Sequence, residues 1–292
     1  MRCMLLLHLL TAATASACTP GDPAACFGNG ACTPSTHTCA CNAGWTSTEC
    51  DVLDLAAVDS RRLGYRNASN PVWGGTVVEY NGQHHLFMGG KRLNAGFVSS
   101  VRTRAVRAVS TTGPEGPYVF AEELTATPAA RLGPAGIGLR VDVHRAPNGS
   151  LVLFTAAAVD RKFGLVALVS PAGDPAGPWF PNLLFRVHTN ASARWDCGQI
   201  ADPSASIAAN GSLLVVFRTK YGCGGMPLER IGLLKAPHWT GPVSRVTTDA
   251  TAPLFGLLVS NEDPYIWHST RGVHMLLHTQ GGIKGPWPDQ YV

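Results

Sequence analysis

The clearest pattern in the sequence is a pair of apolar segments joined by a glycine-containing turn, and it recurs four times. The turns are Asn81-Gly82, Asn148-Gly149, Asn210-Gly211 and Arg271-Gly272. Three of them are Asn-Gly, which favours a two-residue type I′ hairpin because both of its central residues need positive φ. The turn glycines are separated by 67, 62 and 61 residues. The pattern therefore predicts four hairpins at a nearly constant period.

Each hairpin belongs to a longer repeated unit. The strand after each turn is apolar on both faces, as expected for a strand packed between neighbouring sheets; these strands cover residues 84–88, 151–154, 213–217 and 273–277. A third apolar segment follows at residues 101–109, 163–169 and 230–236, and then a Gly-Pro step at 116–117, 177–178 and 241–242. A four-stranded unit repeated in this way is typical of a propeller blade. We therefore predict an all-β fold in which residues 63–292 form a β-propeller.

The fourth unit is shorter than the others. Gly285-Pro286 follows the last turn glycine by only 13 residues, whereas the earlier gaps are 34, 28 and 30. Residues 63–292 thus predict three blades and part of a fourth, which cannot close a ring and would leave sheet edges unpaired. We expect the chain to be a truncated form of a longer protein.

The N-terminus has the pattern of an export signal. Arg2 precedes an apolar run at residues 4–10, and small residues follow up to residue 17, which predicts a cleavable secretory signal over residues 1–17. Of nine cysteines, Cys3 would leave with the signal, so an even number remains for pairing. Four Asn-x-Ser sequons are candidate glycosylation sites: Asn67, Asn148, Asn190 and Asn210. Together these features predict a secreted glycoprotein with no membrane span.

Six cysteines lie close together at residues 18–50, with the spacing C-x7-C-x5-C-x6-C-x-C-x8-C. A segment this short cannot close an apolar core, so disulfides must replace one, and six cysteines allow fifteen connectivities. The spacing, with Gly28-Asn29-Gly30 before the third cysteine and Gly44-Trp45 near the end, resembles the EGF-like family. The resemblance implies three pairs: Cys18–Cys32, Cys26–Cys39 and Cys41–Cys50. Residues 14–17 lack the carboxylates of calcium-binding members, so we expect no calcium here.

Two interpretations of this module remain open. It could bind an extracellular protein partner, or it could be a passive spacer joined by a linker at residues 51–62. The two remaining cysteines, Cys197 and Cys223, bracket the third hairpin and predict a fourth, structural disulfide.

Candidate chemistry lies at the start of the first strand of each unit. In a propeller these strands begin near the central funnel, so the residues nine positions before each turn glycine should converge; they are Trp73, Arg140, Asp202 and Asp263. Glu262 and Asp142 lie within two positions of this set, and Trp73, Trp195 and Trp267 are candidate sugar platforms.

Three short segments resemble the propeller glycosidases, the group of arabinanases, β-xylosidases, invertases and levansucrases. They are Ala201-Asp202-Pro203-Ser204, the run from Asn261 to Trp267, and Gly177-Pro178-Trp179, within residues 70–278. In arabinanase-like members the resemblance implies an inverting reaction with an Asp base in the first blade, an Asp that tunes proton affinity in the third and a Glu acid in the fourth. Asp202 and Glu262 line up with the last two.

The first blade departs from this pattern. Neither Asn70 nor Trp73 can act as a base, and Asp142 in the second blade is the candidate substitute. Each acid also has a structural alternative: Asp202 as a turn residue, Asp142 as a salt-bridged or solvent-facing strand residue beside Arg140 or Arg145.

The sequence therefore favours a secreted carbohydrate-active protein that binds a glycan, with hydrolysis of glycosidic bonds as a further activity. The alternative is a non-catalytic adhesion or matrix protein. The net charge of +4, with dispersed arginines, predicts no nucleic-acid partner. No nucleotide, serine-hydrolase or zinc-protease motif occurs, and on a strand His274 and His278 would lie about 13 Å apart. We expect no cofactor and no metal.

Overall fold

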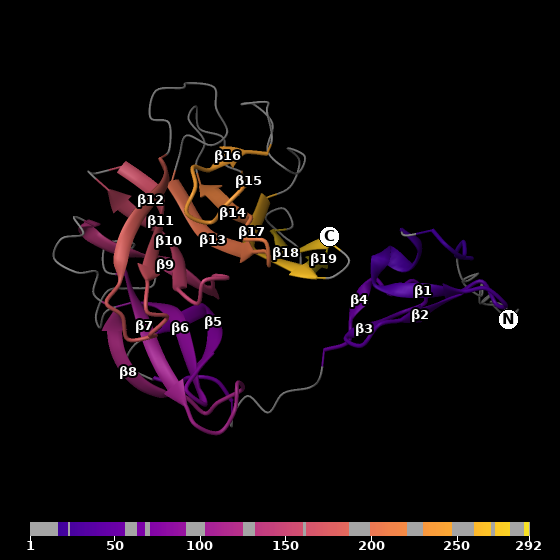
Figure 1. Cartoon of the computed structure of the whole chain (residues 1–292), viewed down its shortest axis with the longest axis horizontal. Coiled ribbons are helices and arrows are strands. Elements are labelled where there is room, and N and C mark those ends of the chain that lie inside the picture. Colours follow the sequence, from indigo (N-terminus) through magenta and orange to yellow (C-terminus); the bar gives the residue numbers. More distant parts are fainter. Residues whose placement is uncertain are drawn as a thin grey trace, which may run out of the picture. The chain divides into compact units, whose positions relative to one another are not determined.

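The computed structural model describes residues 17–22, 24–55, 63–67, 71–91, 103–124, 132–159, 162–186, 199–220, 230–246, 260–269, 272–280 and 289–291. The chain divides into two compact units, Met1–Ala57 and Val58–Val292 (Figure 1). Several predicted features lie outside the described residues: the signal segment up to residue 16, Asn70, Asn190, Trp195, Cys197 and Cys223. The fourth disulfide therefore stays a prediction.

Disulfides hold the N-terminal unit together in place of a large core. Its elements are a short 3-10 helix η1 (Ala25–Gly28), the paired strands β1 (Gly30–Thr33) and β2 (Thr38–Cys41), and the paired strands β3 (Trp45–Thr46) and β4 (Val52–Leu53). The bridges join Cys18 to Cys32, Cys26 to Cys39 and Cys41 to Cys50. This pairing is the one that the resemblance implied, and it fits an EGF-like module.

The described residues of the second unit form four antiparallel sheets, each built from strands in chain order. Sheet 1 contains β5 (Val72–Tyr80), β6 (Gln83–Lys91), β7 (Thr103–Ser110) and β8 (Val119–Leu124). Sheet 2 contains β9 (Leu132–Arg145), β10 (Leu151–Val159), β11 (Lys162–Ser170) and β12 (Phe180–Arg186). Sheet 3 contains β13 (Gln199–Ile207), β14 (Leu213–Lys220), β15 (Arg230–Ala236) and β16 (Ser244–Arg245). Sheet 4 contains β17 (Ser260–Ser269), β18 (Gly272–Gln280) and β19 (Asp289–Tyr291).

These sheets confirm the predicted all-β class and the four-stranded repeat. Every predicted second and third strand is present, with its ends moved by a few residues. The first strands of the sheets, called the inner strands below, are neighbours: β5 lies beside β9, β9 beside β13, and β13 beside β17. Among the described residues, no helix is long and apolar enough to cross a membrane.

The hairpin turns follow the predicted type in one case. Asn81 and Gly82 have φ of 51° and 73° and join β5 to β6 directly, as a type I′ turn requires. The connection before β10 is five residues long, and in it only Gly149 has positive φ. There the Asn148 side chain accepts a hydrogen bond from the Ser150 amide at 3.1 Å. Asn often stabilises a turn in this way, by binding its own backbone two residues further on. The third hairpin repeats this arrangement, so type I′ was wrong for both.

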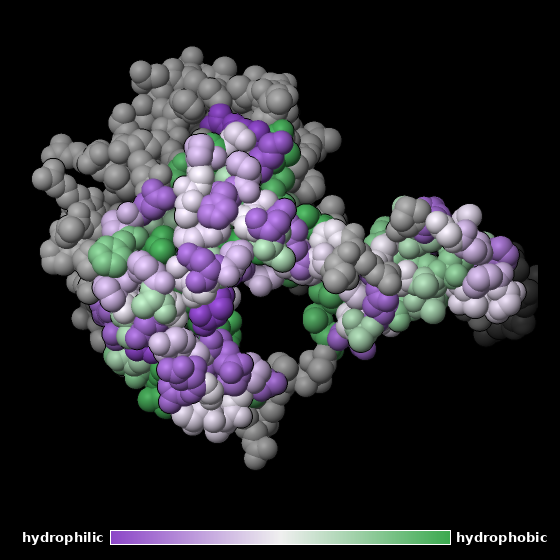
Figure 2. Space-filling model, viewed as in Figure 1, coloured by the Kyte–Doolittle hydropathy of each residue, from purple (hydrophilic) through white to green (hydrophobic). Residues whose placement is uncertain are grey.

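The apolar core lies between successive sheets. Between sheets 1 and 2, the rings of Phe87 and Trp179 meet edge to face at 5.8 Å. Between sheets 2 and 3, Phe154 and Phe217 belong to one buried cluster. A Cβ on Gly232 would lie 2.3 Å from the Phe217 ring, so glycine is needed there for close packing. Hydrophilic residues cover most of the described surface of this unit on the face shown in Figure 2, as expected when apolar side chains pack between sheets.

Three of the four sequons lie in the described residues. Asn148 and Asn210 are exposed at hairpin turns. Asn67 is partly buried, and its side-chain amide donates a hydrogen bond to the Tyr65 hydroxyl at 3.0 Å.

Candidate functional site

Three inner strands carry a β-bulge at the same place in their sheets. The ladder shifts between Trp73 and Thr76 in β5, between Ala201 and Ser204 in β13, and between Glu262 and Tyr265 in β17. Each bulge sets two residues of the inner strand opposite one residue of its partner. The first of the two has positive φ in every case: 60° at Gly74, 47° at Asp202 and 46° at Asp263. Asp tolerates this conformation better than most residues because its short side chain can hydrogen-bond locally.

The bulges show which residues of the inner strands are equivalent between sheets. They correct the alignment that was expected from counting nine residues back from each turn glycine. Asp202 and Asp263 are equivalent, as expected, but their counterpart in sheet 1 is Gly74, one residue after Trp73. Sheet 2 has a longer irregularity, between Ile137 and Val141, and Arg140 lies at its end. A Cβ on Gly74 would lie 3.3 Å from the Cγ atom of Arg140. The first sheet therefore presents backbone, with the Arg140 side chain beside it, where two other sheets present a carboxylate.

Asp202 and Glu262 bind one guanidinium group. The Arg218 Nη2 atom lies 2.5 Å from Asp202 Oδ2, and its Nη1 atom donates to Glu262 Oε1. Arg218 comes from β14, where it pairs with Ala201 directly before the bulge. The exposed fractions are 4% for Asp202, 5% for Arg218 and 26% for the Glu262 side chain. The ion pairs therefore connect two buried groups of sheet 3 to a partly exposed carboxylate of sheet 4.

Burial dominates the proton affinity of Asp202. It raises the pKa of Asp202 to about 6, although Arg218 acts in the opposite direction. Asp263 and Glu262 add to the rise because like charges disfavour ionisation. The guanidinium group has a smaller effect on the pKa of Asp202 than burial has, so it does not cancel the rise.

A second ion pair continues the cluster toward sheet 2. Arg140 Nη1 lies 3.5 Å from Oδ1 of Asp263, whose side chain is 53% exposed. The carbonyl oxygen of Arg140 accepts a hydrogen bond from the Thr155 hydroxyl at 3.0 Å, which holds the backbone there. Tyr265 follows the bulge in β17, and burial raises its pKa, with a smaller rise from Asp142. Three carboxylates, two guanidinium groups and a phenol thus lie near one another.

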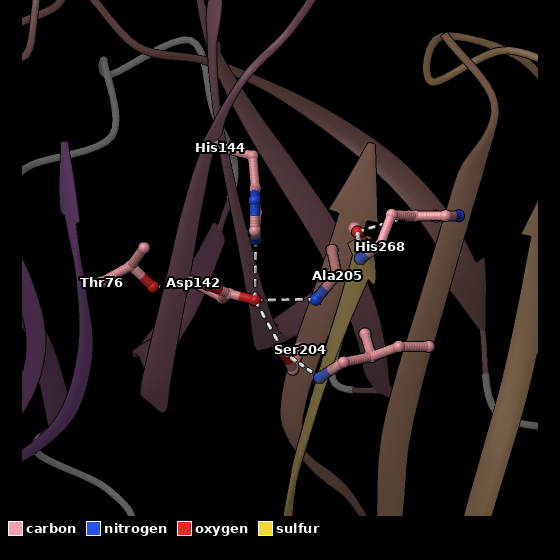
Figure 3. A network of polar contacts seen from close by, with 8 residues as sticks. Thr76, Asp142, His144, Ser204, Ala205 and His268 are labelled. Carbon is pink, nitrogen blue, oxygen red and sulfur yellow. Dashed lines mark hydrogen bonds and ion pairs between the residues drawn. The ribbon is translucent and has the colours of Figure 1, made fainter. Parts of the chain in front are cut away.

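Asp142 lies deeper, and protein groups occupy both of its carboxylate oxygens (Figure 3). Thr76 donates to Oδ1, while Ser204 Oγ at 2.9 Å and the Ala205 amide at 2.7 Å donate to Oδ2. His144 Nε2 is 3.0 Å from the same Oδ2 atom. Burial alone would raise the pKa of Asp142, but the charge and hydrogen bond of His144, with those of Thr76 and Ala205, lower it to about 2.

The structure separates one predicted sugar platform, Trp267, from this cluster. Trp267 follows Glu262 by five residues on β17, which corresponds to roughly 16 Å along a strand. Its ring stacks on His274 with centroids 5.2 Å apart and an interplanar angle of 18°. Trp73 pairs with Gly89 beside the bulge of β5 and is partly buried. The ion pairs of Arg218 and Arg140 bring together Asp202, Glu262, Asp263 and Arg140 from the predicted set.

Arg218 and Gly74 were not predicted as members of the site. Arg218 directly follows the apolar run Val215-Val216-Phe217, and a charged residue after such a run was the available signal. Gly74-Gly75 directly after Trp73 was the signal for the first bulge, because glycine inside a strand often marks one.

Comparisons with known proteins identify the fold of the second unit. No protein-family model matches the sequence, and no curated protein matches it either. Among solved structures, an α-L-arabinanase from Cellvibrio cellulosa superposes with a TM-score of 0.53 at 12% identity, covering 75% of this chain and 72% of the arabinanase. The chain shares the fold of the arabinanase-type glycosidases.

Two further structures agree with this fold. A family 117 glycoside hydrolase from the marine bacterium Zobellia galactanivorans gives a TM-score of 0.56 at 13% identity, over 79% of this chain and 70% of that one. An endo-arabinase from Bacteroides thetaiotaomicron gives 0.54 at 15% identity, over 82% and 78%. At such identities the arabinanase-type likeness concerns the fold, so function has to be argued from the side chains.

Proposed function

We propose that this chain is an exported protein that binds a glycan where the bulges of β13 and β17 meet. The observation that carries the proposal is the pair of carboxylates, Asp202 and Glu262, held by Arg218 at the start of adjacent inner strands. Carboxylates and guanidinium groups supply the acceptors and donors that sugar hydroxyls need. The arabinanase-type fold and the three disulfides support a carbohydrate ligand and an oxidising compartment.

Inverting hydrolysis would need a second carboxylate across the sugar, roughly 6.5–9.5 Å from the acid, to activate water. Asp202 can hold a proton near neutral pH because its pKa is raised to about 6. Within the described residues, however, Gly74 occupies the equivalent place in sheet 1, and both oxygens of Asp142 already accept hydrogen bonds. We therefore propose glycan binding as the primary function and an inverting reaction only as a secondary one.

Calorimetric titration of the full chain against arabinan, xylan and fructan oligosaccharides tests this proposal. Glu262→Gln should weaken binding by about tenfold, the effect of about 1.4 kcal/mol. The matched control is Glu122→Gln, which removes an ion pair with Arg107 in sheet 1, away from the bulges. Folded wild-type protein that binds none of the glycans, or equal affinity in all three proteins, would overturn the proposal. Hydrolysis that disappears in Glu262→Gln would instead make the chain an enzyme.

The adhesion alternative rests on the N-terminal unit. Phe27 is 63% exposed on its short helix, and an exposed aromatic residue is a common anchor for a protein partner. If this unit binds a partner, Phe27→Ser should reduce adhesion of the protein to cell-surface or matrix extracts while glycan affinity stays unchanged. Unchanged adhesion would leave the unit as a spacer.

A further inference from the structure

One carboxylate connects the inner strands of three sheets. Asp142, on β9, is only 2% exposed. It accepts a hydrogen bond from Thr76 on β5 and two from β13, given by the Ser204 hydroxyl and the Ala205 amide. Figure 3 shows these donors approaching from strands on both sides of β9. Neighbouring sheets are thus joined by directed bonds in addition to apolar packing.

The chain of hydrogen bonds continues to the fourth sheet. The Ser204 hydroxyl, while donating to Asp142, accepts a bond from the Ile266 amide on β17 at 3.2 Å. Two residues further on, Ser206 and His268 repeat the link between β13 and β17, with the His268 amide 3.1 Å from the Ser206 hydroxyl. Because hydrogen bonds in a chain polarise one another, the link through Ser204 depends on the negative charge of Asp142.

These bonds lie directly beside the candidate site. Ser204 follows Asp202 by two residues and Ile266 follows Glu262 by four, so each bulge is the next feature along its strand. A bulge interrupts the ladder and leaves its own residues without regular pairing. The orientation of a bulge therefore depends on the hydrogen bonds of the residues just after it. Here those bonds lead to Asp142, directly or through Ser204.

We propose that Asp142 is a positioning residue: by holding Ser204 and Ala205, and through Ser204 the Ile266 amide, it sets the two bulges and so the relative placement of Asp202 and Glu262. The proposal rests on the proposed glycan site. It assigns Asp142 a role different from the base expected from its sequence position. It also explains why the carboxylate is buried beneath the site.

The chemistry of the position requires an acid. The hydroxyls of Thr76 and Ser204 and the Ala205 amide present three donors, the His144 Nε2 atom lies 3.0 Å from Oδ2, and an ionised carboxylate is acceptor-only. Asparagine has the same shape, but its amide group would place donors against donors. Asp142→Asn therefore removes bonds without opening a cavity, which separates positioning from packing.

Residue-resolved amide hydrogen exchange tests the bonds themselves. In Asp142→Asn, the Ala205 and Ile266 amides should exchange about tenfold or more faster than in wild type, because local protection reports the free energy of local opening. The Val106 amide in sheet 1 should not change, and Glu122→Gln should alter none of the three. If Asp142→Asn fails to fold, Ser204→Ala serves instead, and should expose Ile266 while Ala205 keeps its bond to Asp142.

The second measurement is made at the candidate site, on the titration of Asp202. In Asp142→Asn, the midpoint of the Asp202 carboxyl signal in an NMR titration should fall from about 6 toward its ordinary value, because a loosened bulge admits water. Glycan affinity should fall as well. Unchanged exchange at Ala205 and Ile266 would refute the proposal. Faster exchange with an unchanged Asp202 midpoint would also refute it, since Asp142 would then be only structural. The midpoint decides this even if no glycan binds, so failure of the proposed function remains a separate result.

Discussion

Asp202 and Asp263 occupy the same place in two different sheets: each is the first residue of a bulge, with φ of 47° and 46°, and each is followed by proline. The repeat thus sets an Asp-Pro step at the same end of two adjacent inner strands. Gly74, with φ of 60°, takes this place in sheet 1. One repeated backbone shape therefore carries aspartate twice and glycine once, and the side chain at the bulge is the variable part.

This equivalence predicts a gain of function. Gly74→Asp should place a carboxylate at a third bulge, since the backbone there already has positive φ like that of Asp202 and Asp263. Arg140 must move by a few tenths of an ångström, which its flexible side chain permits. We expect release of reducing sugar from a bound glycan to appear or rise in this variant, because it adds a carboxylate that can serve as the missing base.

The control is Gly82→Asp, which imposes the same kind of substitution at positive φ, in the β5–β6 turn where a Cβ meets nothing within 4 Å. Both variants should lose a little thermal stability. If both, or neither, change hydrolysis, the equivalence of Gly74 with the two aspartates has no catalytic meaning.

A second prediction concerns the cost of ionising Asp202. Its pKa is about 6 in the folded chain, above that of an unfolded Asp, so the folded state binds more protons between about pH 4 and pH 6, and stability falls as the pH rises through this window. The full difference corresponds to about 3 kcal/mol. Asp202→Asn does not titrate, so its Tm relative to wild type should be higher at about pH 7 than at about pH 4. A difference that does not depend on pH would contradict the raised pKa.

The hairpin framework could be predicted from the sequence because its signals are local. Asn81-Gly82 requires only its own two φ angles, and the strand at residues 151–154 requires only its run of apolar side chains. The bulges could not be predicted in the same way, because a shift of register exists only between two paired strands. A count of residues back from the turn therefore gave Trp73 in place of Gly74.

The role of Asp142 depends on groups more than sixty residues away. Its donors on Thr76 and Ser204 are separated from it by 66 and 62 residues, so no pattern around Val141-Asp142-Val143 distinguishes a buried acceptor from a surface acid. Arg218 was missed for the same reason, since Glu262 lies 44 residues beyond it. Residue types limit the candidates, but tertiary contacts assign the roles.

Asp142 should also dominate the acid sensitivity of the fold. Its pKa is lowered to about 2, so its stabilising effect is complete above the pKa of an unfolded Asp and is lost as the pH falls from about 4 to about 2. The loss amounts to about 2 kcal/mol. Wild type should therefore be destabilised more steeply than Asp142→Asn over this range in urea denaturation. The groups facing this carboxylate are His144, Tyr265 and the three donors. His144→Gln should flatten the slope, because the charge and hydrogen bond of His144 contribute most to the lowered pKa of Asp142. Parallel slopes in wild type and Asp142→Asn would contradict the lowered pKa.

The last prediction concerns the shared cation. Arg218→Met removes the guanidinium group that lies 2.5 Å from the Asp202 carboxylate, which is only 4% exposed. Breaking a buried ion pair from one side costs about 3–5 kcal/mol. Arg218→Lys keeps the charge, but a single ammonium group cannot present two donors in the planar geometry that reaches Asp202 and Glu262 together. We therefore expect the free energy of unfolding to decrease in the order wild type, Arg218→Lys, Arg218→Met.

The double variant Arg218→Met with Asp202→Asn should recover part of the loss, because the buried negative charge is then removed as well. A double-mutant cycle in urea measures this coupling. Additive losses would mean that Arg218 acts through packing alone, and the two carboxylates would then need another explanation for lying so close together.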